Sequence, residues 1–165
     1  NDFGNLASRA IAMVEKYCEG KIPAVAHEPE LANAAATAAS IADQRIAALD
    51  FQGGILAILD FCKSVNGYVT DRAPWVLAKD PAKKGELDQV LYATCESLRI
   101  LAVLFHPVMP ESCQKLWRAL GASTLGELAS QRIDSVANWG QLPAGAQTYR
   151  GEVLFPRLAD GNGAE

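Results

Sequence analysis

The chain is poor in the residues that build metal and redox sites. It has two histidines and four cysteines, and the cysteines are far apart with no C-x-x-C pair: Cys18, Cys62, Cys95 and Cys113. Zinc is held by several such ligands at short spacing, so this pattern predicts no metal site. Each cysteine has apolar neighbours at helical spacing, which is typical of reduced core thiols in a cytoplasmic protein.

Long apolar runs and an excess of positive charge are also missing. No apolar stretch approaches the ~20 residues that a membrane-spanning helix needs, so we expect no membrane partner. We expect no signal peptide, because the sequence opens directly on an amphipathic stretch, and the abrupt start predicts a piece of a longer protein. The net charge is −4, whereas a domain that holds nucleic acid mainly through its phosphates is usually basic. If the chain binds RNA, a few contacts to bases should carry the selectivity.

The sequence has no recognisable catalytic motif. A glycine-rich phosphate loop and a nucleophile paired with a base are both absent. His27 lies in a proline-containing linker, which predicts a surface position, and His106 precedes Pro107, which predicts the end of a helix. We therefore expect no catalytic residue in this chain.

Half of the 165 residues are apolar, which is enough for one domain with a core. Apolar residues recur at helical spacing, and this predicts an all-α bundle of about five helices with antiparallel neighbours. Gly53 and Gly54 allow two interpretations: the third helix begins at Ile55, or a partner helix passes close to it. The expected helices cover residues 1–19, 28–49, 51–68, 86–106 and 110–120. A short extended segment is expected at 152–158, with the domain covering 1–159 and a flexible tail covering 160–165.

The first expected helix presents two polar side chains on the side away from its apolar stripe. Asn5 and Arg9 are four residues apart, so they lie one turn apart on one face. A solvated surface pair is one interpretation. The other is a reader of a nucleobase, because an amide offers donors and an acceptor while a guanidinium offers a fork of donors. Asn5 can accept from N4 of a cytosine while Arg9 donates to O2 or N3, a pattern that uracil does not match.

Trp75 follows Pro74 at a connection between two expected helices. Tryptophan is usually buried, so core packing is one interpretation. The other is base stacking, because proline fixes φ and limits where the next ring can point, and RNA-binding proteins stack unpaired bases on aromatic rings. Such a stack contributes ~1–3 kcal/mol per base. The other two tryptophans, Trp117 and Trp139, are expected to pack in the core.

Three sequence motifs resemble those of one family. They are Asn1-Asp-x-Gly-Asn5-Leu-Ala-Ser-Arg9, Arg72-Ala-Pro-Trp-Val-Leu-Ala-Lys79 and His106-Pro-Val-Met-Pro110. The first two resemble the anticodon-binding domain of the methionyl-tRNA synthetases, which are class I enzymes, and the likeness extends over nearly the whole chain. The third motif is shared by several class I synthetases and is less specific.

The resemblance implies that Asn5 and Arg9 read the first anticodon base and that Trp75, after Pro74, stacks on it. The implied partner is the anticodon loop of tRNA(Met), bound by the helical anticodon-binding domain typical of class I synthetases. The family's adenylate-forming signatures, H-I-G-H and K-M-S-K-S, and its zinc-bearing insertion are absent from this sequence. The resemblance therefore assigns ATP, magnesium and methionine activation to a catalytic domain elsewhere in the full-length protein. It also implies a monomer, because the dimerisation domain of some members is not in this chain.

Two alternatives stay open on the sequence alone. The isoleucine, valine, leucine and cysteine synthetases have related helical domains. The acidic net charge and the alanine-rich second helix also suit a helical module that binds protein and no RNA. Lys79, Lys83 and Lys84 form a basic turn that either contacts anticodon-stem phosphates or stays solvated.

Overall fold

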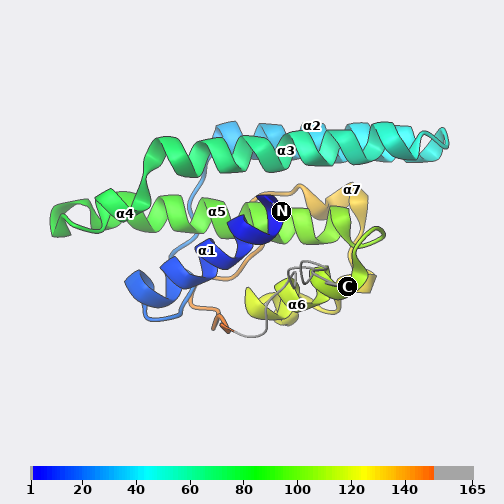
Figure 1. The fold of residues 1–165 in the computed structure, drawn as a ribbon. Coiled ribbons are helices and arrows are strands. Elements are labelled where there is room, and N and C mark those ends of the chain that lie inside the picture. Colours follow the sequence, from blue (N-terminus) through cyan, green and yellow to red (C-terminus); the bar gives the residue numbers. More distant parts are fainter. Residues whose placement is uncertain (1, 151–165) are drawn as a thin grey trace, which may run out of the picture.

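The computed structural model describes residues 2–150, and it is helical throughout apart from connections and one isolated antiparallel bridge between Lys21 and Gln147 (Figure 1). The predicted all-α bundle of about five helices is confirmed. Within this described range, five helices have ten residues or more: α1 (Asp2–Cys18), α2 (Pro29–Ala47), α3 (Phe51–Arg72), α5 (Lys84–Phe105) and α6 (Pro110–Ala119). The expected extended segment 152–158 and the tail 160–165 lie outside the described residues.

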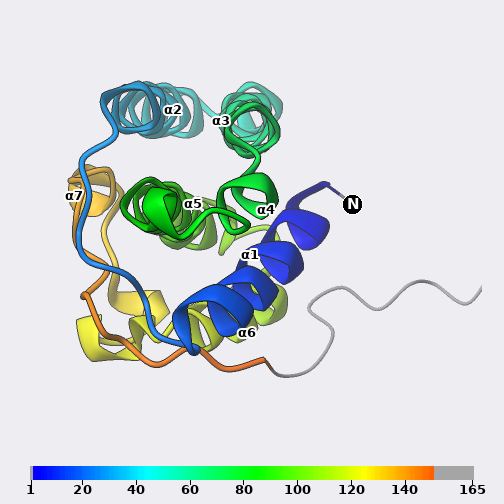
Figure 2. The same ribbon diagram turned by 90° about the vertical axis from the view of Figure 1, so that its left-hand side faces the viewer.

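Helix α5 is the centre of the bundle. Residues 91–100 of α5 are all buried, and α5 contacts α1, α2, α3, α6 and two single-turn helices, α4 (Pro74–Leu77) and α7 (Ile133–Val136). Figure 2 shows α2 and α3 on one side of α5 and α1 and α6 on the other. This cover buries α5 all round along that stretch, including the polar side chains of Glu96 and Arg99. In the described part of the chain, no helix is long and apolar enough to span a membrane.

Helices α2 and α3 pack closely because small residues face each other. A Cβ added to the buried Gly54 would lie 3.2 Å from Cγ1 of Ile46 and 3.6 Å from the carbonyl oxygen of Ala42. The second interpretation of the glycine pair is therefore correct, since a partner helix passes close. The helix also begins at Phe51, before the glycines, because the Asp50 carboxylate caps it by accepting from the backbone N of Gly53 at 2.9 Å.

Helix α3 is one turn longer than predicted. It continues through the Asn-Gly pair at 66–67, since burial of Tyr68 and Val69 outweighs the local turn preference. It ends at Ala73, which has a left-handed backbone with φ of 46°. Pro74 then begins α4. The extra turn brings α4, which contains the Pro-Trp motif, to the end of the bundle (Figure 1).

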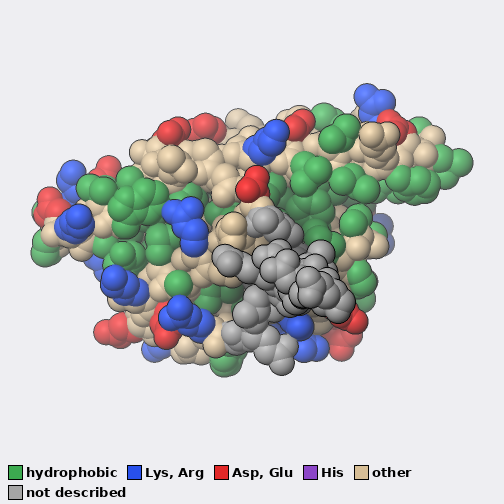
Figure 3. All heavy atoms as spheres, in the orientation of Figure 1, with side chains coloured by type: hydrophobic (Ala, Val, Ile, Leu, Met, Phe, Trp, Pro, Cys, Tyr) green, Lys and Arg blue, Asp and Glu red, His purple; other side chains and the backbone are tan. Residues whose placement is uncertain are grey.

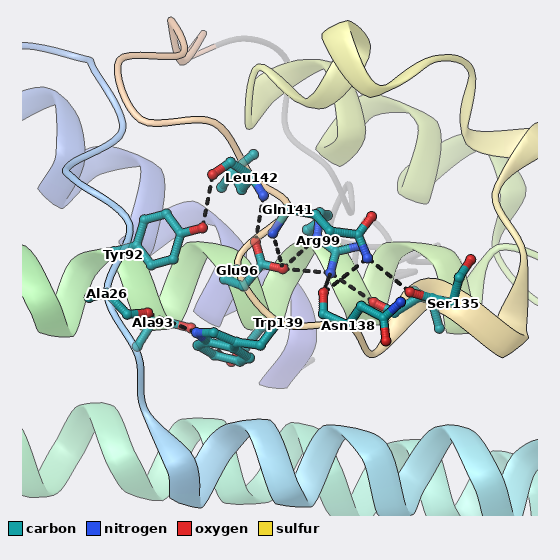
Figure 4. A network of polar contacts seen from close by, with 12 residues as sticks. Ala26, Tyr92, Ala93, Glu96, Arg99, Ser135, Asn138, Trp139, Gln141 and Leu142 are labelled. Carbon is teal, nitrogen blue, oxygen red and sulfur yellow. Dashed lines mark hydrogen bonds and ion pairs between the residues drawn. The ribbon is translucent and has the colours of Figure 1, made fainter.

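A buried polar network fastens the chain that follows α6 to α5 (Figure 4). The Arg99 Nε donates to Glu96 at 2.7 Å, and Arg99 Nη2 donates to the carbonyl of Val136 at 2.7 Å. The Glu96 carboxylate also accepts from the backbone N of Leu142 at 2.8 Å, while the Tyr92 hydroxyl donates to the Leu142 carbonyl at 2.8 Å. Glu96 and Arg99 are fully buried, so this ion pair holds the returning chain inside the protein.

The structure gives the positions of the two histidines, of the two tryptophans expected to pack in the core, and of the four cysteines. His27 is exposed and His106 caps the end of α5, as expected. Both packing tryptophans donate to backbone carbonyls, Trp117 to Gly126 and Trp139 to Ala26. Of the four cysteines, three are buried and Cys18 is half-buried. Burial raises the pKa of Cys62 to about 11 and the pKa values of Cys95 and Cys113 to about 12.

Candidate nucleic-acid interface

The structure brings side chains of the first two sequence motifs together where α1 meets α4. The guanidinium carbon of Arg9 lies 5.4 Å from the centroid of the Trp75 ring. Asn5 lies one turn before Arg9 on the same exposed side of α1. The buried side of α1, which includes Leu6 and Ala10, packs into the core. An amide, a guanidinium and an indole therefore belong to one surface.

The side chains of Asn5 and Arg9 remain available to a ligand. Asn5 and Arg9 are both exposed, and neither makes a side-chain hydrogen bond or ion pair with another described residue. A cation over an indole face at this distance is attracted by ~0.5–1 kcal/mol at an exposed position. The contact orients the Arg9 guanidinium and leaves its N–H donors open to a further partner.

The backbone around Trp75 explains why its ring stands at the surface. Ala73 turns the chain with its left-handed conformation, and Pro74 occupies the first position of α4, where a missing N–H costs nothing. Pro74 is buried, and Leu77 packs against the core, so α4 is anchored on that side. Trp75 is 37% exposed. Trp75 is thus partly exposed on an anchored turn and is not a fully buried core residue.

The three lysines of the basic turn after α4 differ in whether they are paired with other residues. Lys84 is engaged internally: its Nζ lies 2.6 Å from Asp88 and donates to the Tyr17 carbonyl at 3.0 Å. The hydrogen bond with Asp88 raises the pKa of Lys84. Lys79 and Lys83 are exposed and have no ion pair with any described residue. Of the three lysines considered from the sequence, these two have ammonium groups available to a ligand.

A metal site is not part of this surface. No group of three or more histidine, cysteine, aspartate or glutamate side chains in residues 2–150 is placed to hold a metal ion. The chemistry that the surface offers is hydrogen bonding, stacking and positive charge, which is the chemistry of single-stranded RNA recognition.

Comparison with known proteins identifies the family. Residues 22–165 match the family model described as the anticodon binding domain of methionyl tRNA ligase. The chain belongs to this family. That match begins after α1, so Asn5 and Arg9 lie outside it, whereas Pro74 and Trp75 lie inside it. Methionine is thereby favoured over the isoleucine, valine, leucine and cysteine enzymes and over a module that binds protein alone.

Relatives of this methionyl-tRNA ligase family extend the match over α1. The methionine–tRNA ligase of Streptomyces coelicolor is 50% identical over 168 residues, which covers 97% of this chain and 31% of the relative. The methionine–tRNA ligase of Enterococcus faecalis is 36% identical, over 96% of this chain and 24% of the relative. The chain therefore spans about a quarter to a third of the length of these relatives.

A solved structure confirms the fold. The apo form of Mycobacterium tuberculosis methionyl-tRNA synthetase superposes with a TM-score of 0.77 at 32% identity, covering 96% of this chain and 32% of that one. The all-α architecture is thus that of the anticodon-binding domain in the methionyl-tRNA ligase family.

Sequence reasoning missed one residue of this surface. Lys16 lies seven residues after Arg9, so it is two turns further along the same side of α1. Its ammonium lies 5.6 Å from the ring centroid of Tyr17. A lone lysine on a helix gives no motif, but its spacing from Arg9 was a readable signal.

Proposed function

We propose that the surface formed by Asn5, Arg9 and Trp75, supported from beneath by the buried Pro74, reads the first base of the CAU anticodon of tRNA(Met). The single observation that carries the proposal is the contact between Arg9 and Trp75, because it joins the two halves of the site from different helices. The matching family, described as an anticodon-binding domain, supports the same role.

In the proposed mechanism the anticodon loop unstacks and its first base stacks on the part of the Trp75 ring that is exposed. The Arg9 guanidinium carbon is 5.4 Å from the ring centroid, so the base stacks on the part of that face that Arg9 leaves open, with its Watson–Crick edge towards the guanidinium. Pro74 does not touch the base; from its buried position it fixes the backbone that aims the indole. A stack of this kind contributes ~1–3 kcal/mol and is tolerant of base identity.

Selectivity for cytosine comes from the α1 side chains. The Asn5 amide oxygen accepts from the N4 amine, and Arg9 donates to O2 or N3. Uracil presents an acceptor where Asn5 needs a donor and an N–H where Arg9 needs an acceptor. Groups left without a partner cost more than satisfied ones gain, so the penalty at the wrong base produces the discrimination.

The remainder of the full-length protein supplies the chemistry. We propose that the complete chain attaches methionine to tRNA(Met) with ATP and magnesium in the cytoplasm, and that it is a monomer. The anticodon-binding domain covers residues 1–159 and the tail covers 160–165. Binding at the site positions the distant acceptor end against a catalytic domain outside these residues.

A binding experiment tests the reading of the base. Stem-loops that carry CAU or UAU are titrated into this chain, and the dissociation constants are compared for the unaltered protein, Asn5→Ala and Trp75→Ala. We expect tighter binding of CAU, loss of the CAU preference in Asn5→Ala, and weaker binding of both loops in Trp75→Ala. Unchanged constants in both variants overturn the mechanism.

The isolated chain should be inactive in amino-acid activation. An ATP–pyrophosphate exchange assay with methionine is expected to give no turnover, because no residue here has the pattern of an adenylate-forming site. Measurable exchange contradicts the assignment of the catalytic step to another part of the protein.

A further inference from the structure

We propose that Lys16 and Lys83 form a phosphate track, which holds the RNA strand that flanks the base stacked on Trp75. The proposal rests on the base-reading function above and extends it. The track continues from the base site along α1 to the start of α5, and its ligand is the phosphodiester backbone of the same anticodon loop.

Helix α1 sets the line of the track. At 100° per residue, Lys16 lies within roughly 40° of both Asn5 and Arg9 around the helix axis, and its Cα is ~10 Å beyond that of Arg9. All three side chains are exposed. A strand that presents a base to Asn5 and Arg9 and then follows the helix towards its C-terminal end therefore passes Lys16.

Contacts at both ends place Lys83 beside the same half of α1. Arg9 contacts Trp75 on α4. Three connecting residues after α4, the 3-10 turn Pro81–Lys83 leads into α5. Lys84, the next residue, donates from Nζ to the carbonyl oxygen of Tyr17 at 3.0 Å. The connection from α4 to α5 thus runs alongside α1 from the base site to Tyr17, and Lys83 lies at its far end.

The acidic groups around the track are largely engaged. The Asp80 carboxylate accepts from the backbone N of Ala82 at 3.0 Å, Asp88 pairs with Lys84 at 2.6 Å, and Glu15 pairs with Arg150 at 3.6 Å. Two exposed acidic side chains nearby have no such partner among the described residues, Glu19 and Glu86.

The two lysines of the track are free by comparison. Lys16 and Lys83 are exposed and make no ion pair with any described residue, and the Tyr17 ring orients the Lys16 ammonium without neutralising it. Figure 3 shows Lys and Arg side chains over α4, the start of α5 and α1, with Asp and Glu side chains among them. Lys16 and Lys83 therefore offer local positive charge to a strand leaving Trp75, on a chain whose net charge is −4.

The salt dependence of binding tests the track. Lys16→Gln, Lys83→Gln and the double variant remove charge while keeping most of the length of the side chain. Each variant is titrated with CAU and UAU stem-loops over a range of salt. Each lost phosphate contact should lower the slope of log K against log salt by about 0.7 for a single strand. We expect both loops to weaken equally, so the CAU preference is kept.

Lys63→Gln is the matched control, because Lys63 is an exposed lysine of α3 with no ion pair to a described residue. An unchanged slope in the double variant, or an equal change in Lys63→Gln, overturns the track. Stem-loops with methylphosphonates in place of the phosphates flanking the first anticodon base locate the contact. They should bind the double variant and the unaltered chain equally, and a difference between the two proteins contradicts it.

The same data separate this proposal from the base-reading one. If Trp75→Ala weakens binding and the lysine variants leave the slope unchanged, the track fails while base reading stands. If Trp75→Ala and Asn5→Ala change nothing, base reading fails and the track fails with it.

Discussion

Arg9 on the first helix and Trp75 on a single-turn helix far along the chain are in contact, with the guanidinium carbon 5.4 Å from the indole centroid. The contact has two consequences. It holds a donor-rich group next to an aromatic surface before any ligand arrives, which reduces the ordering that binding must supply. It also makes each residue sensitive to changes in the other, so their contributions to binding should not be additive.

Replacing Trp75 should weaken RNA binding without unfolding the protein. Trp75→Ala removes a base stack worth ~1–3 kcal/mol, which corresponds to roughly 5- to 150-fold in affinity. Trp75 is 37% exposed, so the substitution also removes buried apolar surface, and the free energy of unfolding should fall by about 1–3 kcal/mol, which leaves the protein folded. Stem-loop titration and urea denaturation measure the two quantities. A variant that unfolds while the affinity of its folded fraction is unchanged would show that the ring is structural.

Arg9→Lys should keep the charge and lose the reading of the base. A lysine ammonium lacks the planar fork, so it cannot make the paired donations or stack flat on the indole. The CAU preference over UAU should fall by roughly 1–3 kcal/mol, the usual worth of a two-bond base contact, with little change in the salt slope. Arg118→Lys is the control, because Arg118 is an exposed arginine on α6. Equal effects of the two substitutions would contradict a specific role for Arg9.

The sequence predicted the helices well and the outer faces less well. Periodicity located all five long helices, and the proline and glycine signals located most of their ends. The apolar spacing within 28–49 and 51–68 includes Leu49, Phe51, Leu56 and Leu59, yet all four are exposed. Periodicity identifies an apolar side of a helix but not whether another element covers it, and here α2 and α3 cover α5 without being covered themselves.

The candidate site shows a similar limit. The first two motifs identified Asn5, Arg9, Pro74 and Trp75. The distance between the motifs along the sequence could not show that Arg9 contacts Trp75. That contact depends on the extra turn of α3, which burial of Tyr68 and Val69 produces against the local preference of an Asn-Gly pair. The internal use of Lys84 was visible only in part: its ion pair with Asp88 has the i,i+4 spacing of a helix, whereas its hydrogen bond goes to Tyr17 on another helix.

Breaking the buried ion pair should destabilise the domain strongly. Glu96→Ala leaves the Arg99 charge buried without its carboxylate, and Nη1 of Arg99 already has no hydrogen-bond partner among the described residues. The expected cost is about 3–5 kcal/mol in the free energy of unfolding, measured by urea denaturation.

The double variant Glu96→Leu with Arg99→Met is the control for that prediction. Because no buried charge is left, it should be more stable than Glu96→Ala alone. If the double variant is the less stable of the two, the cost comes from lost packing and lost bonds to the returning chain, and the account based on charge is wrong.

Stability should fall at alkaline pH because of the buried thiols. Burial raises the pKa of Cys95 from 9.0 to about 12, so the folded state keeps a proton that the unfolded state loses. The contribution of this group is therefore complete below pH ~9 and is lost as the pH rises towards the folded pKa. Cys95→Ala should show a shallower fall in unfolding free energy between pH 8 and 10.5. Parallel curves for the two proteins would contradict the assignment.

The central claim is that one nucleobase stacks on Trp75 beside Arg9 and Asn5. The most direct measurement uses a CAU stem-loop with a fluorescent cytosine analogue, whose emission falls on stacking, at the first anticodon position. Saturating it with the unaltered chain should quench the emission, and saturating it with Trp75→Ala should not. Equal quenching by both proteins, or by the unaltered chain when the analogue is placed in the stem, would contradict the claim.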